Sequence, residues 1–157
     1  MTEFLQTYFG KMLTTAAVSM LPVVELRGGI PYGTALGLGP WDAFFAAVAG
    51  NMIPVPFILL LIRQIFDWLR RGRFGSAILR LEERAHLKGR MVRKYRLVGL
   101  CILVAIPLPG TGAWTGALVA ALLNVRLRHA LPAIFLGVII AGVLILTLTY
   151  GVIHIAG

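Results

Sequence analysis

The sequence IPLPGTG at residues 106–112 interrupts an apolar stretch that runs from residue 97 to residue 124. Two prolines and two glycines in this short segment remove backbone donors and loosen a helix. As a helix, residues 97–107 would rise only ~16 Å, about half of a ~30 Å hydrocarbon core. The segment therefore predicts a re-entrant hairpin, which enters the bilayer, turns at mid-depth and returns. Its turn would be formed by Pro107, Pro109, Gly110 and Gly112.

A second group of helix breakers lies in ELRGGIPYG at residues 25–33, after an apolar stretch that begins near residue 4. This arrangement predicts a first re-entrant hairpin. We expect the backbone to turn tightly at Gly28, Gly29, Pro31 and Gly33. Unwound backbone at membrane depth is tolerated only where it lines protein or a water-filled cavity, so both turns are expected to face such a cavity.

Two further apolar stretches, residues 41–62 and 129–155, are long enough to cross the bilayer as helices. Asn51, Pro54 and Pro56 are expected to kink the first of them. Each half of the chain then consists of a hairpin followed by a span, which is an odd number of crossings. We predict an all-α integral membrane fold in which residues 1–62 and 97–157 form an inverted repeat within one transmembrane domain, residues 1–157.

Composition supports the membrane assignment, because the chain is 59% hydrophobic and only 13% charged, with a mean hydropathy of +0.87. Most of its 15 Lys and Arg residues fall in residues 63–96, a linker that also contains a predicted amphipathic helix at residues 74–96. Such a basic patch could bind nucleic acid. Its position between apolar runs instead favours contact with anionic lipids and a cytoplasmic location at the prokaryotic plasma membrane.

The positions of the basic segments also favour a hairpin at residues 97–124 over a fourth span. If every apolar stretch crossed the bilayer, residues 63–96 would lie on the opposite face from Arg126, Arg128 and His129. A hairpin places both basic segments on one side, as the positive-inside rule prefers.

Glu25 and Arg27 are the ionisable residues of the first predicted turn. A charge at membrane depth usually faces a cavity and often marks function. Glu25 is therefore a candidate to bind and release a proton, and Arg27 a candidate to grip a phosphate or carboxylate. Alternatively, the two side chains neutralise each other or lie in the aqueous interface.

Three further residues are candidates for the substrate or ion site. Asn51 is polar at membrane depth, although a structural hydrogen bond between helices would also explain it. Thr111 lies in the second turn, and Trp114 could stack on a lipophilic substrate or simply pack. The single cysteine, Cys101, and scattered histidines predict no metal site and no disulfide. We expect no cofactor and no catalytic residue, because the sequence lacks GxxxxGK[ST], GxSxG and HExxH motifs.

The paired motifs ELRGGIP at residues 25–31 and PLPGTGAWTG at residues 107–116 resemble those of the small multidrug export family, over nearly the whole chain. That family is in turn distantly similar to the DedA superfamily of lipid-handling membrane proteins. The resemblance implies two opposed re-entrant hairpins, with an acidic residue in the first and arginines in the second. Some DedA members translocate polyprenyl phosphates. Glu25 matches the acidic position, whereas residues 107–116 contain no arginine, so Arg27 would have to substitute.

These observations together predict a small membrane transporter, coupled to a proton or cation, that moves an amphiphilic substrate between the two turns. The substrate would be a drug-like compound or a lipid carrier. A homodimer or larger homo-oligomer is expected, because two spans shield little volume. Two alternatives remain: a DedA-like flippase or scramblase for a phospholipid or polyprenyl phosphate, and a membrane-integrity scaffold that transports nothing.

Overall fold

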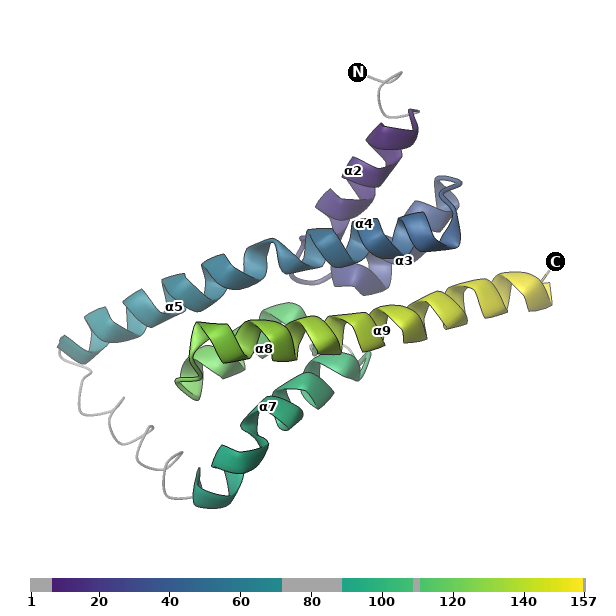
Figure 1. Ribbon diagram of the computed structural model, residues 1–157. Helices are drawn as coiled ribbons and strands as arrows, with labels where there is room; N and C mark the ends of the chain where they lie inside the picture. The colour runs from purple at the N-terminus through teal and green to yellow at the C-terminus, as the bar shows by residue number, and fades with distance from the viewer. Residues whose placement is uncertain (1–6, 72–88, 109–110, 157) are drawn as a thin grey trace.

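The computed structural model describes residues 7–71, 89–108 and 111–156, and every regular element in these ranges is an α-helix. The first half contains α2 (Tyr8–Ser19), α3 (Glu25–Ala35), α4 (Pro40–Met52) and α5 (Pro54–Arg71). The second half contains α7 (Gly89–Ala105), α8 (Ala113–Leu122) and α9 (Leu127–Ala156). Figure 1 shows α4 and α5 as one long, interrupted rod that runs antiparallel to α9.

Helices α2 and α3 form a hairpin in which small residues allow the backbones to approach closely. A Cβ atom on Gly29 would overlap the hydroxyl of Ser19, and one on Gly33 would lie 2.9 Å from Cγ2 of Thr15. Between lipids of equal hydrophobicity, such close packing of small residues is a main source of helix association. The hairpin is therefore joined by its glycines, and its turn lies at residues 20–24.

Helix α4 packs against both arms of this hairpin. Ala43 and Ala47 face Gly33 and Gly29 of α3, and Gly50 lies directly on the backbone of Ala16 in α2. The rod is interrupted at Ile53, between α4 and α5, where Pro54 and Pro56 remove backbone donors. The predicted kink near Asn51 is therefore present.

Helices α7 and α8 form a second hairpin, which packs against α9. Gly116 of α8 and Gly137 of α9 both lie against Val104 of α7, so that α7 is held between two glycine contacts. At the open end of this hairpin, Arg96 donates a hydrogen bond to the carbonyl of Leu123 at 3.2 Å. That carbonyl belongs to the end of α8, where helical partners are missing.

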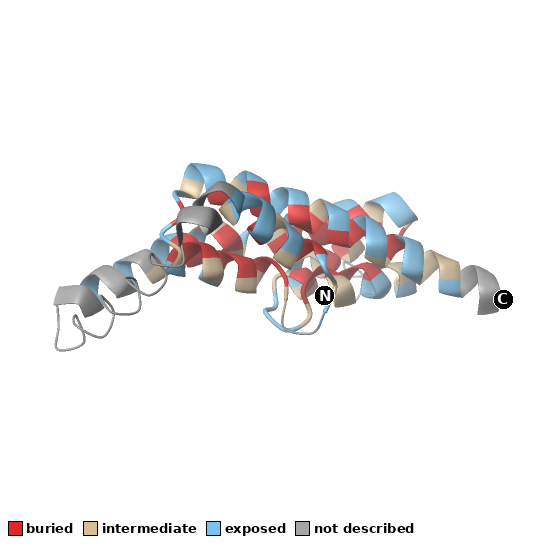
Figure 2. Ribbon diagram, turned by 90° about the horizontal axis from the view of Figure 1, so that it is seen from below, coloured by how far each residue is buried: buried red, intermediate tan, exposed pale blue. Residues whose placement is uncertain are grey.

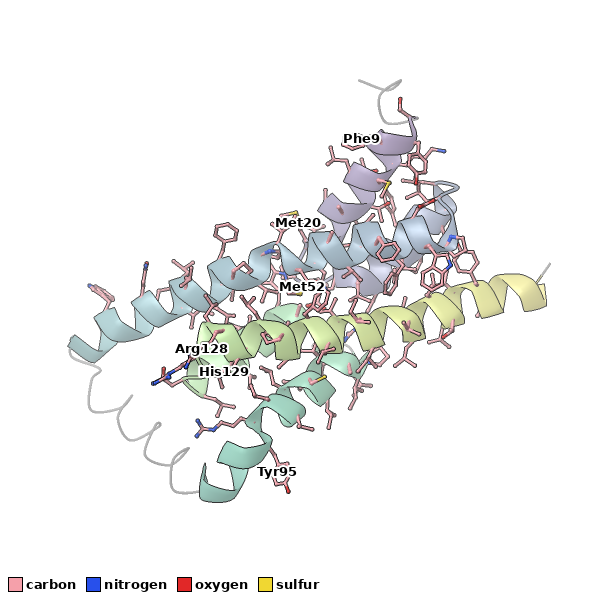
Figure 3. All side chains as sticks on the ribbon, in the orientation of Figure 1. Phe9, Met20, Met52, Tyr95, Arg128 and His129 are labelled. Carbon is pink, nitrogen blue, oxygen red and sulfur yellow. The ribbon has the colours of Figure 1, made fainter. Side chains whose placement is uncertain are left out.

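The two hairpins point toward each other, and their turns lie side by side near the middle of the molecule (Figure 1). Contacts also cross between the halves, because α5 packs beside α8 and α3 beside α9. The end of α5 and the start of α9 lie at one end of the molecule, where Arg128 and His129 are found (Figure 3). The end of α5, which belongs to the basic linker, and the basic residues at the start of α9 thus lie on the same side of the molecule.

Two helical segments are long and apolar enough to cross a membrane: Pro40–Ile62, with 23 residues, and Leu127–Val152, with 26 residues. They match the predicted spans at residues 41–62 and 129–155. The apolar segments of the second hairpin, Tyr95–Ala105 and Ala113–Leu122, are shorter. A helix of ten residues rises ~15 Å, about half of the hydrocarbon core. Buried residues line the facing sides of the helices (Figure 2). Large apolar side chains are exposed on much of the outside.

The predicted linker at residues 63–96 is helical at both ends, because α5 continues to Arg71 and α7 already begins at Gly89. Both helices therefore extend beyond their apolar segments, into sequence where charged residues are mixed with apolar ones. Of the predicted amphipathic helix at residues 74–96, the part before residue 89 lies outside the described residues.

The contact between Gly50 and Ala16 predicts a stability effect. In Gly50→Ala the new Cβ would overlap backbone atoms of Ala16, so α2 must shift. We expect the free energy of unfolding in detergent to fall by ~1–3 kcal/mol. The matched control is Gly99→Ala in α7, where a Cβ meets nothing within 4 Å. This control should leave stability unchanged or raise it by up to ~1 kcal/mol, and equal effects of both substitutions would contradict the close contact.

Candidate functional site

Glu25 lies at the contact between the two hairpins. It is the first residue of α3 and its side chain is only 5% exposed. Its carboxylate accepts a hydrogen bond from the backbone N–H of Trp114, at 3.3 Å from Oε1. Trp114 is the second residue of α8, so the carboxylate of one half occupies the helix N-terminus of the other. Unpaired N–H groups and the helix dipole both favour a negative charge at this position.

Two unusual backbone conformations bring this carboxylate and the helix end together. Glu25 has a φ of 49°, which costs a non-glycine residue about 1–2 kcal/mol. Gly112, the residue before α8, has a φ of 155°, and a Cβ there would overlap the Glu25 carboxylate. A residue with a side chain at position 112 would therefore exclude Glu25 from the helix end.

Arg27 extends from α3 into the second turn. Its guanidinium donates hydrogen bonds to the backbone carbonyls of Leu108 and Thr111, and a longer one of 3.3 Å to the carbonyl of Ile106. It also donates to the Thr111 hydroxyl at 2.9 Å. These carbonyls lie at and beyond the end of α7, where helical partners are missing. The five donors of a planar guanidinium can satisfy several such acceptors at once.

Thr111 organises the turn that Arg27 enters. Its hydroxyl lies 2.7 Å from the carbonyl oxygen of Ile106 and 2.9 Å from that of Leu108, either of which can accept its proton. The same oxygen accepts a hydrogen bond from the N–H of Leu108 at 3.2 Å. The turn is therefore held by hydrogen bonds of its own Thr111 and by hydrogen bonds from Arg27 of the other hairpin.

Trp114 makes the third link between the halves. Its indole N–H donates to the carbonyl of Met20 at 3.1 Å, and Met20 is the residue that ends α2. The partly buried ring also packs against the apolar core. Each half thus supplies hydrogen-bonding groups to helix ends of the other half.

Asn51 is fully buried near the end of α4, and neither its side-chain oxygen nor its nitrogen has a hydrogen-bond partner among the described residues. The structural hydrogen bond considered from the sequence is therefore not formed to any residue that the structure describes. A buried carboxamide without partners costs about 1–3 kcal/mol. Such a group is an exception in folded proteins and asks for an explanation.

The structure joins four of the five predicted site residues in two hydrogen-bonded pairs: Arg27 with Thr111, and Glu25 with Trp114. Of the predicted second turn, Pro107 and Gly112 lie between α7 and α8, while Pro109 and Gly110 lie outside the described residues. Across the described residues there is no group of three His, Cys, Asp or Glu side chains that could hold a metal ion.

The prediction for the first turn is wrong. Gly28, Gly29, Pro31 and Gly33 lie inside α3, and the chain turns before them, at residues 20–24. Glycine is tolerated inside a helix where a neighbouring helix packs too closely for a side chain, and Gly29 and Gly33 make such contacts. Sequence reasoning also missed the carbonyls of Ile106, Leu108 and Met20, since main-chain acceptors carry no residue-specific signal.

A groove of about 530 Å³ lies away from this site, on the outer side of α3 and α9. It is lined by Pro31, Thr34, Ala35, Leu148, Thr149 and Val152. Beside it, the Tyr150 hydroxyl donates to the carbonyl of Leu38 at 3.3 Å and lies 3.4 Å from the Thr34 hydroxyl. These contacts join the end of α9 to the far end of α3.

The fit between Gly112 and Glu25 can be tested with a double-mutant cycle. Gly112→Ala should lower the free energy of unfolding by ~1–3 kcal/mol, because its Cβ would overlap the carboxylate. In a Glu25→Ala background part of that loss should disappear, giving a coupling energy of ~0.5–3 kcal/mol. Strictly additive losses, measured by denaturant unfolding in detergent, would contradict the contact.

Removing the carboxamide of Asn51 should stabilise the protein. Asn51→Leu keeps a similar shape and eliminates two unpartnered polar atoms, so we expect the free energy of unfolding to rise by ~1–3 kcal/mol. Thr15→Val is the matched control, because Thr15 is equally buried but donates to the carbonyl of Lys11 at 2.8 Å. This control should lose ~0.5–1.5 kcal/mol. Loss of stability in Asn51→Leu would mean that the carboxamide has a partner.

Comparison with known proteins identifies one family. No curated protein and no solved structure matches the chain. A sequence model of one family, described as putative small multi-drug export protein, matches residues 25–144, a range that begins at Glu25 and includes Arg27, Thr111 and Trp114. Because the match covers most of the 157 residues, the chain belongs to this small multi-drug export family.

Proposed function

We propose that the protein is a small exporter of the prokaryotic plasma membrane, which couples movement of a proton or cation to export of an amphiphilic substrate. The observation that carries this proposal is the buried Glu25 carboxylate at the contact between the two halves. An acidic group in that place can change charge only if the surrounding contacts change too. Membership of the small multi-drug export family supports transport as the general activity.

The mechanism follows from the hydrogen bonds of Glu25. While it is ionised, the carboxylate is attracted to the N-terminus of α8. Binding of a proton or a cation removes that negative charge and weakens the contact between the turns. The turns can then separate and admit substrate, and release of the ion restores the contact. In this scheme the present structure, with its turns in contact, corresponds to a closed state.

The scheme requires that both hairpins be re-entrant and that the two halves be inverted copies. Three features support this requirement. Of the hairpin helices, α2, α3 and α8 have only 12, 11 and 10 residues, too few to cross a bilayer, and the apolar part of α7 is limited to Tyr95–Ala105. The two turns meet near the middle of the molecule, and the basic ends of α5 and α9 share one end (Figures 1 and 3). That end is proposed to be cytoplasmic, together with residues 63–96.

A homodimer or larger homo-oligomer is part of the proposal. Only two segments are long enough to cross the membrane, and less than half of each is buried within one chain, 44% and 33%. Large apolar side chains such as Phe57, Leu61 and Leu136 are exposed on their outer faces. A second copy would cover part of this surface, and membrane lipids the remainder.

The alternative of a DedA-like lipid flippase or scramblase has one specific observation in its favour. The relatives that the sequence resembles have arginine in the second hairpin, which is absent here from residues 107–116. Arg27 supplies a guanidinium to that turn from the first hairpin instead. The substrate would then be a phospholipid or a polyprenyl phosphate.

The decisive experiment compares Glu25→Gln with the wild type. In inverted membrane vesicles we expect uptake of ethidium, driven by a pH gradient, to fall at least about tenfold, the effect of ~1.4 kcal/mol of lost coupling. Gln keeps the shape of Glu but cannot exchange a proton. Asp42→Asn in the first turn of α4 is the matched control, since it removes a carboxylate far from the contact, and it should transport normally.

The same variants separate the rival functions. If Glu25→Gln leaves pH-driven ethidium uptake unchanged, the coupled exporter is excluded. If a fluorescent phospholipid still moves between the leaflets of proteoliposomes that contain Glu25→Gln, a passive scramblase would be favoured. A protein that moves neither compound, but loses its cellular role when arginines in residues 80–96 are replaced, would be a scaffold.

A further inference from the structure

We propose that Asn51 is the hydrogen-bond acceptor for the protonated form of Glu25. The starting observation is the Asn51 carboxamide, which is fully buried and has no partner among the described residues. A buried polar group without a partner in one state is explained if it gains a partner in another. The inference rests on the proposed function only in assuming that Glu25 binds a proton.

The register of α3 against α4 places Asn51 at the level of Glu25. A Cβ on Gly33 would lie 3.1 Å from Cβ of Ala43, and one on Gly29 would lie 3.4 Å from Cβ of Ala47. The two helices are thus antiparallel: four residues back along α3, from Gly33 to Gly29, correspond to four residues forward along α4, from Ala43 to Ala47. Residues four apart share a helix face. The next step leads from Gly29 to Glu25 and from Ala47 to Asn51.

The chemistry of the two neighbours of Glu25 differs. The N-terminus of α8 offers backbone N–H groups, which donate hydrogen bonds and cannot accept them. These suit a carboxylate. A protonated carboxyl group has an O–H that needs an acceptor when it is buried. The Asn51 side chain provides one in Oδ1, and its NH₂ group can donate to the other carboxyl oxygen.

The protonation state of Glu25 then decides its partner. A proton that arrives from water adds to one carboxylate oxygen, and no other bond forms or breaks. The new O–H turns to Oδ1 of Asn51, and the hydrogen bond to Trp114 weakens because the acceptor has lost its charge. When the proton leaves, the carboxylate returns to the end of α8 and Asn51 again lacks a partner. Asn51 is therefore a positioning residue, which acts through Glu25.

The other ionisable groups near this pair are few. Arg27, on the same helix, is the charged neighbour of Glu25, and its guanidinium is held by the second turn. Helix α8 contains no ionisable residue. On the helices packed against α3, the described ionisable residues nearest to it lie at its far end. They are Lys11 beside Gly37, Asp42 beside Gly39, Tyr8 beside Asp42, and Tyr150 beside Thr34.

The test uses two variants of equal shape, Asn51→Thr and Asn51→Val, because the Thr hydroxyl can accept a hydrogen bond and the Val methyl group cannot. The full-length protein is titrated in lipid between about pH 4 and pH 9 while the infrared C=O band of protonated carboxyl groups is recorded. The band that disappears in Glu25→Gln belongs to Glu25. Thermal unfolding of both variants shows whether they are equally folded.

We expect Asn51→Thr to keep the band of a hydrogen-bonded acid. In Asn51→Val the band should move to higher wavenumber, as for a carboxyl group without an acceptor. The midpoint of its titration should fall by about one pH unit, the size of one hydrogen bond to the neutral form. Proton-driven ethidium uptake should follow the same order, with Val slower than Thr.

Identical bands and midpoints in the Thr and Val variants would overturn the proposal, as would the absence of any Glu25 band over this pH range. Both readouts are independent of transport. If the infrared results are as expected but Glu25→Gln still transports ethidium, the proton site stands and the coupled exporter fails. Failure of the exporter and failure of the Asn51 assignment are thus distinguishable.

Discussion

The fold depends on the hydrogen bonds that each hairpin makes, beside its turn, to helix ends of the other hairpin. Arg27 satisfies carbonyls that follow α7, Glu25 satisfies the start of α8, and Trp114 satisfies the end of α2. In the proposed re-entrant arrangement the turns lie within the bilayer, where no water is available to do this, so backbone groups at a helix end must find protein partners. Each half therefore completes the other, and the centre of the molecule is polar although it is surrounded by apolar helices.

Glycine and alanine make this polar centre possible by bringing the helices close. Gly29, Gly33 and Gly50 fix the spacing of α2, α3 and α4, and Gly137 does the same for α7 and α9. With the helix positions fixed, a side chain as short as Glu25 can reach α8 from its own backbone at the start of α3. Small shifts of one hairpin would then be transmitted to the contact between the turns.

Much of this arrangement could be predicted from the sequence. The breakers at residues 106–112 located the second turn, and the lengths of the apolar stretches located both long helices. Glu25, Arg27 and Thr111 were recognisable because charged and polar groups are costly at membrane depth. The first turn was misplaced because Gly29 serves close packing as readily as it serves a turn, and one sequence does not distinguish the two uses. The carbonyls that Arg27 contacts could not be predicted, because every residue carries one.

The mutual completion of the hairpins has a consequence for how the protein is made. Arg27 and its partner Thr111 are 84 residues apart in the chain. At a synthesis rate of about 5–20 residues per second, the first hairpin waits roughly 4–17 s before its partner is made. During that interval the guanidinium has no turn to bind, and under the proposed re-entrant arrangement it could not remain alone in hydrocarbon. In that arrangement the first hairpin would be held near the aqueous interface or within the insertion machinery, and it would reach its final depth only after the second half has been synthesised.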